Sequence, residues 1–216
     1  MLCEIYDAPE TRKTYAAHAR RLLAAARAIR ARLLASPVVD LEIDGVVRRC
    51  ALGSEVIIGR ENCTIVSWSS RVSRHHLRIA RSPDGVFVED LGTDNGTRFA
   101  DGTRLAGRVA VSAPLALWLA DAPCVIEPAP PGVLITLSGA RRYFAPVGDL
   151  GVFGWRIAYD AAGPYVTLAT RKGFERPYLG THQVAACIEL SRGDSFSAEP
   201  GGPVRLRVPA NSDVFV

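Results

Sequence analysis

Three short stretches between residues 57 and 97 decide the fold of this chain. The sequence reads IIGR at residues 57–60, SRHHL at residues 73–77 and DLGTDNGT at residues 90–97. Apolar and polar residues alternate around them, as in β-strands with one buried face, and Gly, Pro and Asp separate the runs. We therefore predict a mainly β chain, in which these stretches are strand ends and loops of a β-sandwich.

The alternation of apolar and polar residues, with its period of two residues, begins after Pro37 and extends on both sides of these stretches. Residues 41–47, LEIDGVV, predict two strands joined by an Asp-Gly turn, and the Asp-Gly pairs at 84–85 and 101–102 repeat that signal. The sequence predicts no helix beyond this point. Residues 128–132, PAPPG, are interpreted as a linker between two domains.

Residues 1–36 predict one amphipathic, arginine-rich helix. A capping pattern at Asp7 begins it, and Ser36 before Pro37 ends it. An apolar stripe runs along it through Tyr15, Ala19, Leu22, Ala26, Ile29 and Leu33. This segment holds seven basic and three acidic residues, so it carries the net charge of +4 and the rest of the chain is balanced. The regular stripe favours packing or a homodimer through this helix over binding to nucleic acid or an anionic membrane.

Residues 129–216 predict a second, smaller β-sandwich that repeats part of residues 37–128. Residues 41–45 align with 135–139 at an offset of 94, whereas 78–80 align with 156–158 at an offset of 78. The second copy therefore lacks 16 residues between these two strands. The missing part is the part of the first copy that holds most of the polar motifs.

Composition excludes several classes of protein. The 216 residues are 48% hydrophobic and 22% charged, which is ordinary for a globular chain. No apolar run is long enough for a membrane helix, and the acidic N-terminal residues do not resemble a signal peptide. The five cysteines are scattered without a C-x-x-C pair, so we expect reduced thiols in the cytoplasm and no zinc site.

The order Gly-Arg, then Ser-Arg-x-His, then Asp-Leu-Gly-Thr followed by Asn-Gly resembles the forkhead-associated (FHA) domain. The resemblance covers about residues 38–127 and implies a β-sandwich that binds phosphothreonine peptides through loops at one end. Residues 129–216 look like a divergent copy, because none of the phosphate-handling side chains is retained there. The domains expected are therefore a helix at 1–36, an FHA domain at 37–128 and an FHA-like sandwich at 129–216.

The resemblance assigns phosphopeptide contacts to the motif side chains Arg60, Ser73, Arg74, Thr93, Asp94 and Asn95. A phosphate dianion requires charge-assisted donors, which the arginines and the serine hydroxyl supply. The amide of Asn95 is expected to hold the peptide backbone beside the phosphothreonine. The resemblance gives a supporting role to Gly59, His76 and Gly96.

One position departs from the family pattern. Asp94 stands where many family members have a threonine, and a carboxylate there repels a phosphate unless it points away or pairs with an arginine such as Arg71. This departure favours the alternative that the fold is a phosphate-independent scaffold.

Enzyme activity is not expected. Ser73, His76 and Asp90 are the residue types of a hydrolase triad, but no Gly-x-Ser-x-Gly elbow accompanies them. Adjacent His75 and His76 on a strand point to opposite faces, so they do not chelate one metal. No Gly-rich nucleotide loop is present, and we expect no catalytic residue, metal, cofactor or small-molecule substrate.

We therefore predict an adaptor that binds a phosphothreonine-containing protein. The resemblance implies a bacterial setting with a Ser/Thr kinase partner or a component of a secretion system.

Overall fold

The computed structural model describes residues 19, 21–23, 36–159 and 165–210. The chain divides into two compact units, residues 1–33 and residues 34–216. Of the predicted N-terminal helix, Ala19 and residues 21–23 are helical, and they include Ala19 and Leu22 of the predicted stripe. Residues 1–18, 20 and 24–35, with the other four residues of the stripe, lie outside the described part, so the predicted homodimer stays a prediction. Within the described residues, no helix has the length and apolar character needed to span a bilayer.

The second unit consists of strands and turns, and residues 36–159 and 165–210 contain no helix. The mainly β fold class is confirmed. The strands are β1 (Val38–Ile43), β2 (Val46–Ala51), β3 (Glu55–Gly59), β4 (Ile65–Val66), β5 (Leu77–Ser82), β6 (Gly85–Asp90), β7 (Thr97–Phe99), β8 (Arg108–Ala110), β9 (Leu115–Leu119), β10 (Ala122–Ala129), β11 (Gly132–Leu137), β12 (Arg141–Ala145), β13 (Leu150–Val152), β14 (Trp155–Tyr159), β15 (Val166–Thr170), β16 (Tyr178–Leu179), β17 (His182–Gln183), β18 (Cys187–Glu189), β19 (Ser195–Ser197) and β20 (Val204–Arg207).

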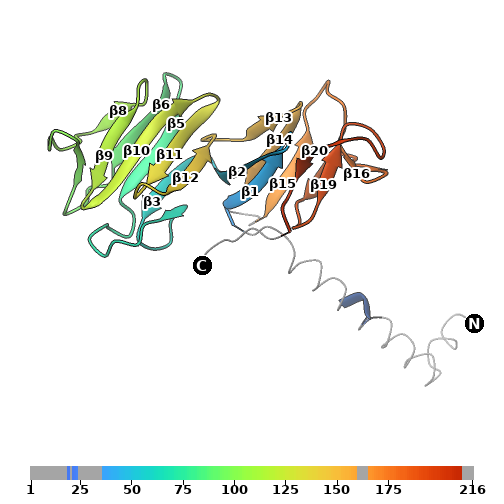
Figure 1. Ribbon diagram of the computed structural model, residues 1–216, viewed down its shortest axis with the longest axis horizontal. Helices are drawn as coiled ribbons and strands as arrows, with labels where there is room; N and C mark the ends of the chain where they lie inside the picture. The colour runs from blue at the N-terminus through green and yellow to red at the C-terminus, as the bar shows by residue number, and fades with distance from the viewer. Residues whose placement is uncertain (1–18, 20, 24–35, 160–164, 211–216) are drawn as a thin grey trace, which may run out of the picture. The chain divides into compact units, whose positions relative to one another are not determined.

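The strands form two lobes that share one long sheet (Figure 1). In the first lobe, the sheet β4-β3-β5-β6-β8 covers the half of the long sheet formed by β12-β11-β10-β9-β7. In the second lobe, the sheet β13-β14-β15-β18 covers the other half, β2-β1-β20-β19-β16-β17. The two halves join where β2 and β12 pair in parallel, at Cys50 and Phe144.

The two lobes have the same strand order. Outward from the β2–β12 junction, β12, β11, β10, β9 and β7 of the first lobe correspond to β2, β1, β20, β19 and β16 of the second. In the covering sheets, β3, β5, β6 and β8 correspond to β13, β14, β15 and β18. This correspondence agrees with the repeat predicted from the sequence.

The hairpins of the two copies are exchanged. The hairpin β1–β2 precedes the first lobe in the chain, but β1 pairs with β20 and its side chains Val39 and Leu41 belong to the core of the second lobe. The hairpin β11–β12 precedes the second lobe, but β11 pairs with β10 and Val133 and Ile135 belong to the core of the first. Each lobe is thus completed by the hairpin that begins the other copy of the sequence repeat.

The exchange places the two cores on opposite faces of the long sheet. Successive residues of a strand point to opposite faces, and Cys50 is buried in the second core whereas Ala51 is buried in the first. The chain leaves both hairpins at an equivalent point, where Gly148 donates a 2.7 Å backbone hydrogen bond to the carbonyl of Gly53. The two lobes are therefore joined in two ways, by the exchanged hairpins and by the Gly53–Gly148 contact where the chain passes between the lobes.

Residues 128–132 require a correction, because they do not form a linker. Ala129 pairs with Gly132, so Pro130 and Pro131 are the turn of the β10–β11 hairpin. Gly132 is required there because a Cβ would lie 2.0 Å from the carbonyl oxygen of Ala145. The predicted boundary between residues 128 and 129 therefore does not separate the two cores. Val133 and Ile135, which follow it, belong to the first core, and Val39 and Leu41, which precede it, belong to the second.

Candidate functional site

The first motif ends β3 against the loop that carries the second motif. A Cβ on Gly59 would lie 1.9 Å from the carbonyl oxygen of Arg74, so only glycine allows these backbones to approach. Two backbone hydrogen bonds fix the approach, from Arg60 to the carbonyl of Ser73 at 3.0 Å and from His76 to that of Ile58 at 2.9 Å. The sequence motifs at 57–60 and 73–77 are therefore adjacent in space.

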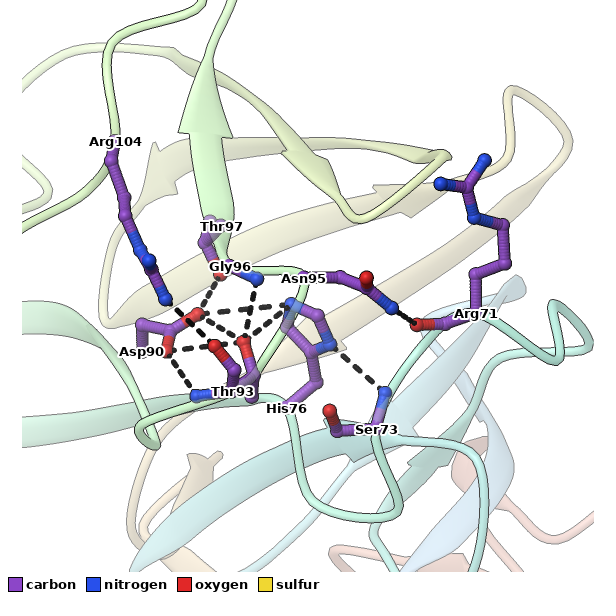
Figure 2. A network of polar contacts seen from close by, with 9 residues as sticks. All are labelled: Arg71, Ser73, His76, Asp90, Thr93, Asn95, Gly96, Thr97 and Arg104. Carbon is purple, nitrogen blue, oxygen red and sulfur yellow. Dashed lines mark hydrogen bonds and ion pairs between the residues drawn. The ribbon is translucent and has the colours of Figure 1, made fainter.

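His76 supports the loop from inside the first lobe (Figure 2). Its side chain is fully buried, and its Nδ1 accepts a 3.1 Å hydrogen bond from the backbone N–H of Ser73. A neutral imidazole that accepts at Nδ1 carries its hydrogen on Nε2, which faces the hydroxyl of Thr93 at 3.4 Å. Burial lowers the pKa of His76 below its usual value, although the charge of Asp90 acts in the opposite direction.

Asp90 is the acceptor at the centre of this group. Its carboxylate accepts hydrogen bonds from the Thr93 backbone at 2.8 Å and from the Thr93 and Thr97 hydroxyls at 2.9 and 2.7 Å. Burial alone would raise the pKa of Asp90, but these hydrogen bonds and His76 outweigh it and hold the pKa below its usual value. The carboxylate thereby fixes the turn that carries the third motif.

The third motif is tied to the second by Asn95. The Asn95 amide donates a 2.7 Å hydrogen bond to the backbone carbonyl of Arg71. Gly96 has a φ of +71°, and a Cβ there would lie 2.8 Å from Nε of Arg104, whose guanidinium donates to the carbonyl of Thr93 at 2.7 Å. Glycine is required at this position both by the backbone angle and by the close approach of Arg104.

These contacts bring four predicted contact residues together at one end of the first lobe. The side chains of Arg60, Arg74 and Asn95 are exposed, and Ser73 is half-buried. Arg71 is also exposed and adds a third guanidinium to these loops. We name residues 60–76 and 91–96 the site loops. Glu61, Asn62, Ser73, Arg74, His75 and Leu91 line a depression between them.

Two further predicted contact residues lie in different surroundings. Thr93 is buried, and its hydroxyl donates to Asp90 and accepts a 3.1 Å hydrogen bond from Gly96, so it lies with the supporting residues. Asp94 is exposed, and its side chain has no ion pair within the described residues, including with Arg71.

Several supporting residues carry no strong signal in the sequence. The Thr97 hydroxyl donates a hydrogen bond to Asp90, and the Arg104 guanidinium donates one to the carbonyl of Thr93. In a sequence, a single threonine or arginine does not indicate such a role. Asp90 was noted only as a hypothetical triad member. The geometry does not form that triad, because His76 binds the backbone N–H of Ser73.

The corresponding loops of the second lobe are different. The two-residue turn 153–154 joins β13 to β14, where the first lobe has residues 60–76. Residues 171–177 join β15 to β16, where the first lobe has residues 91–96. The second lobe therefore lacks the segment that holds Arg60, Ser73 and Arg74.

Residues 56–114 match the model of the FHA domain family. This part of the chain is similar to FHA domains. The match lies within the first lobe and includes the site loops. No curated protein matches the chain.

The solved structures similar to this chain include FHA domains. FHA-1 of Rv1747 from Mycobacterium tuberculosis is 22% identical over 42% of this chain and 93% of that one, with a TM-score of 0.31. EmbR from Mycobacterium tuberculosis, in complex with a low-affinity phosphopeptide, is 23% identical over 53% of this chain and 30% of that one, with a TM-score of 0.31. The FHA domain of CT664 from Chlamydia trachomatis is 26% identical over 38% of this chain and 88% of that one, with a TM-score of 0.29.

FHA domains are interaction modules and not enzymes, and the chemistry of the site fits that class. In the part of the chain that the structure describes, no three His, Cys, Asp or Glu side chains are grouped to hold a metal ion. The site offers donors on pinned loops and one half-buried hydroxyl. Charged and hydroxyl donors of this kind can form charge-assisted hydrogen bonds to an anion.

Proposed function

We propose that this protein is a non-enzymatic adaptor whose FHA domain binds phosphothreonine-containing segments of partner proteins. The observation that carries the proposal is the convergence of Arg60, Ser73, Arg74 and Asn95 on two loops fixed by a buried network. Pinned loops favour binding because little conformational entropy is lost when a ligand orders them.

Each donor has a part in the proposed complex. Arg60 and Arg74 supply charge to the phosphate, and Ser73 adds a hydroxyl donor. The Arg60 guanidinium contacts Glu61 at 3.3 Å, but both side chains are about half exposed, at 41% and 55%. Exposed pairs of this kind are worth only about 0–1 kcal/mol, so a phosphate dianion can displace Glu61. Asn95 then contacts the peptide backbone, while His76, Asp90 and Thr93 hold the loops.

The setting is also part of the proposal. The partner would be the substrate of a bacterial Ser/Thr kinase, in a signalling or secretion system, and the protein would act in the cytoplasm. The four cysteines that the structure describes, Cys50, Cys63, Cys124 and Cys187, are free, which supports a reducing compartment.

Titration with a degenerate phosphothreonine peptide library and its unphosphorylated counterpart tests the proposal. We expect binding only with the phosphate, and a loss of roughly 10- to 100-fold for Arg60→Ala or Ser73→Ala, since each removes a charge-assisted hydrogen bond. Arg176→Ala, which removes an exposed arginine of the second lobe, is the matched control and should bind normally. Binding that ignores the phosphate would refute the proposal.

The alternative function is a phosphate-independent scaffold. The exposed carboxylate of Asp94 within a site loop is the observation that favours it. Under this alternative, the phosphorylated and unphosphorylated libraries bind equally or not at all, and Arg60→Ala changes neither result.

A further inference from the structure

Asp94 lies in the loop 91–96, between two anchored residues. Thr93 on one side is buried and hydrogen-bonded to Asp90, and Asn95 on the other donates to the carbonyl of Arg71. The Asp94 side chain is exposed, and within the described residues it has neither an ion pair nor a hydrogen bond. Its carboxylate is therefore held at the site without a partner from this chain's described part.

The other acidic residues around the site are occupied. Glu61 pairs with Arg60 at 3.3 Å, and Asp121 accepts a 2.5 Å hydrogen bond from the hydroxyl of Ser69. Asp90 is covered by the hydroxyls of Thr93 and Thr97. Among these four, Asp94 is thus the carboxylate that has no partner within the described residues before a ligand binds.

A bound phosphopeptide would bring a dianion close to this carboxylate. The repulsion is felt over the screening length of about 8 Å at physiological salt, which exceeds the distance between neighbouring residues. A lysine or arginine of the peptide placed beside the phosphothreonine relieves that repulsion and pairs with Asp94. An acidic residue in the same place adds to the repulsion.

We infer that Asp94 makes the FHA domain selective for phosphothreonine segments that carry a basic residue beside the phosphothreonine. This inference rests on the proposed function. It turns the departure from the family pattern at Asp94 into a determinant of the substrate class.

The test uses the full chain and alanine-rich phosphothreonine peptides with one lysine or one glutamate at each of the three positions before and after the phosphothreonine. We expect at least one position where lysine binds about three- to tenfold more tightly than glutamate, as for an exposed charge pair that replaces a repulsion. Asp94→Asn should reduce this preference to near unity, mainly by improving binding of the glutamate peptide.

Glu61→Gln is the matched control, because it also removes one exposed carboxylate beside the site. It frees Arg60 for the phosphate, so it should tighten all the phosphopeptides by a similar factor and leave the lysine preference intact. A lysine preference that falls equally in Glu61→Gln and Asp94→Asn would assign the selectivity to overall charge and overturn the inference.

The remaining outcomes separate the inference from the proposed function. Phosphate-dependent binding with the same lysine preference in wild type and Asp94→Asn overturns the inference and leaves the proposed function standing. Phosphate-dependent binding by Asp94→Asn alone also overturns it, because Asp94 would then block the site. No phosphate-dependent binding by either protein refutes the proposed function, and the inference with it.

Discussion

The two lobes share a strand order, but only the first has the site loops. The first lobe has seventeen residues, 60–76, between β3 and β5, whereas the second has the turn 153–154 between β13 and β14. Both lobes keep a closed apolar core, with residues such as Ile79 and Val88 in the first and Ile157 and Val166 in the second fully buried. The fold is therefore carried by core and turn residues, and the site by loops that can be lost without losing the fold.

The lobes also depend on each other for their cores. The exchange of hairpins gives each core side chains from the hairpin that begins the other copy of the repeat. The second lobe lacks the site loops but is still needed for the first, because it is linked to the hairpin β11–β12 and holds β1–β2. The second copy is explained by this structural role even though it lacks the site.

The largest effect is expected from cutting the chain after residue 128, at the predicted domain boundary. This removes β11 and β12 and with them six buried side chains of the first core, Val133, Ile135, Leu137, Tyr143, Ala145 and Val147. Losing one large core side chain costs about 2–5 kcal/mol, and a domain has only about 5–15 kcal/mol of stability. We expect the fragment 1–128 not to fold, as measured by circular dichroism and amide proton dispersion.

Deleting residues 1–33 is the control for that truncation. These residues form the other compact unit, so the remaining chain should keep the thermal transition of the β unit. A folded fragment 1–128 with native peptide binding would show that the lobes are independent.

The next effect concerns two glycines, Gly59 at the end of β3 and Gly154 in the turn between β13 and β14. In Gly59→Ala the new Cβ meets the Arg74 backbone, so the loops must separate, at a cost of about 1–3 kcal/mol. In Gly154→Ala it meets the ring of Phe174, an exposed side chain that can rotate, and the strain of φ +78° costs about 1 kcal/mol. Peptide titration should show at least a tenfold loss for Gly59→Ala and none for Gly154→Ala. Equal binding by the two variants would contradict the assignment of the site to the first lobe.

The strands and the site were predictable to different extents. The Asp-Gly turn at residues 44–45 was predicted, and both residues have positive φ angles of 47° and 78°. The exchange of hairpins was not predictable, because Val39 and Leu41 show the same alternation as Val133 and Ile135. The alternation of apolar and polar residues predicts that one face of a hairpin is buried, but it does not indicate in which core that face lies.

The sequence also did not distinguish a linker from a turn at residues 128–132, and it did not reveal which groups hold the site loops in place. Proline and glycine at residues 128–132 favour both linkers and hairpin turns, and only the pairing of β10 with β11 decides between them. The motif residues around Arg60 and Ser73 were predicted from the chemistry of their side chains. The acceptor for Asn95 was missed because it is a backbone carbonyl, which every residue has.

The smallest effect is a dependence of stability on pH that belongs to the first lobe. Among the described residues, His76 is the buried histidine, and its folded pKa lies below the unfolded value of about 6.5. Between these two values the unfolded chain binds a proton that the folded chain does not. The free energy of unfolding therefore decreases as the pH falls below about 6.5, by up to about 1.4 kcal/mol per pH unit, until the folded pKa is reached. Asp90, whose folded pKa is also lowered, adds a loss only at more acidic pH, below about 3.9.

His76→Gln tests the assignment of this slope. The glutamine amide does not titrate, and it can accept from Ser73 and donate to Thr93 in place of the imidazole. Urea unfolding from pH 7 to pH 5 should show the decrease in wild type and a flatter profile in the variant. The second lobe has no counterpart of this network, since Gly154 and Leu168 stand where the repeat aligns His76 and Asp90. If the free energy of unfolding of His76→Gln depends on pH as it does in wild type, the titrating group is not His76. The pH dependence would then not distinguish the two lobes.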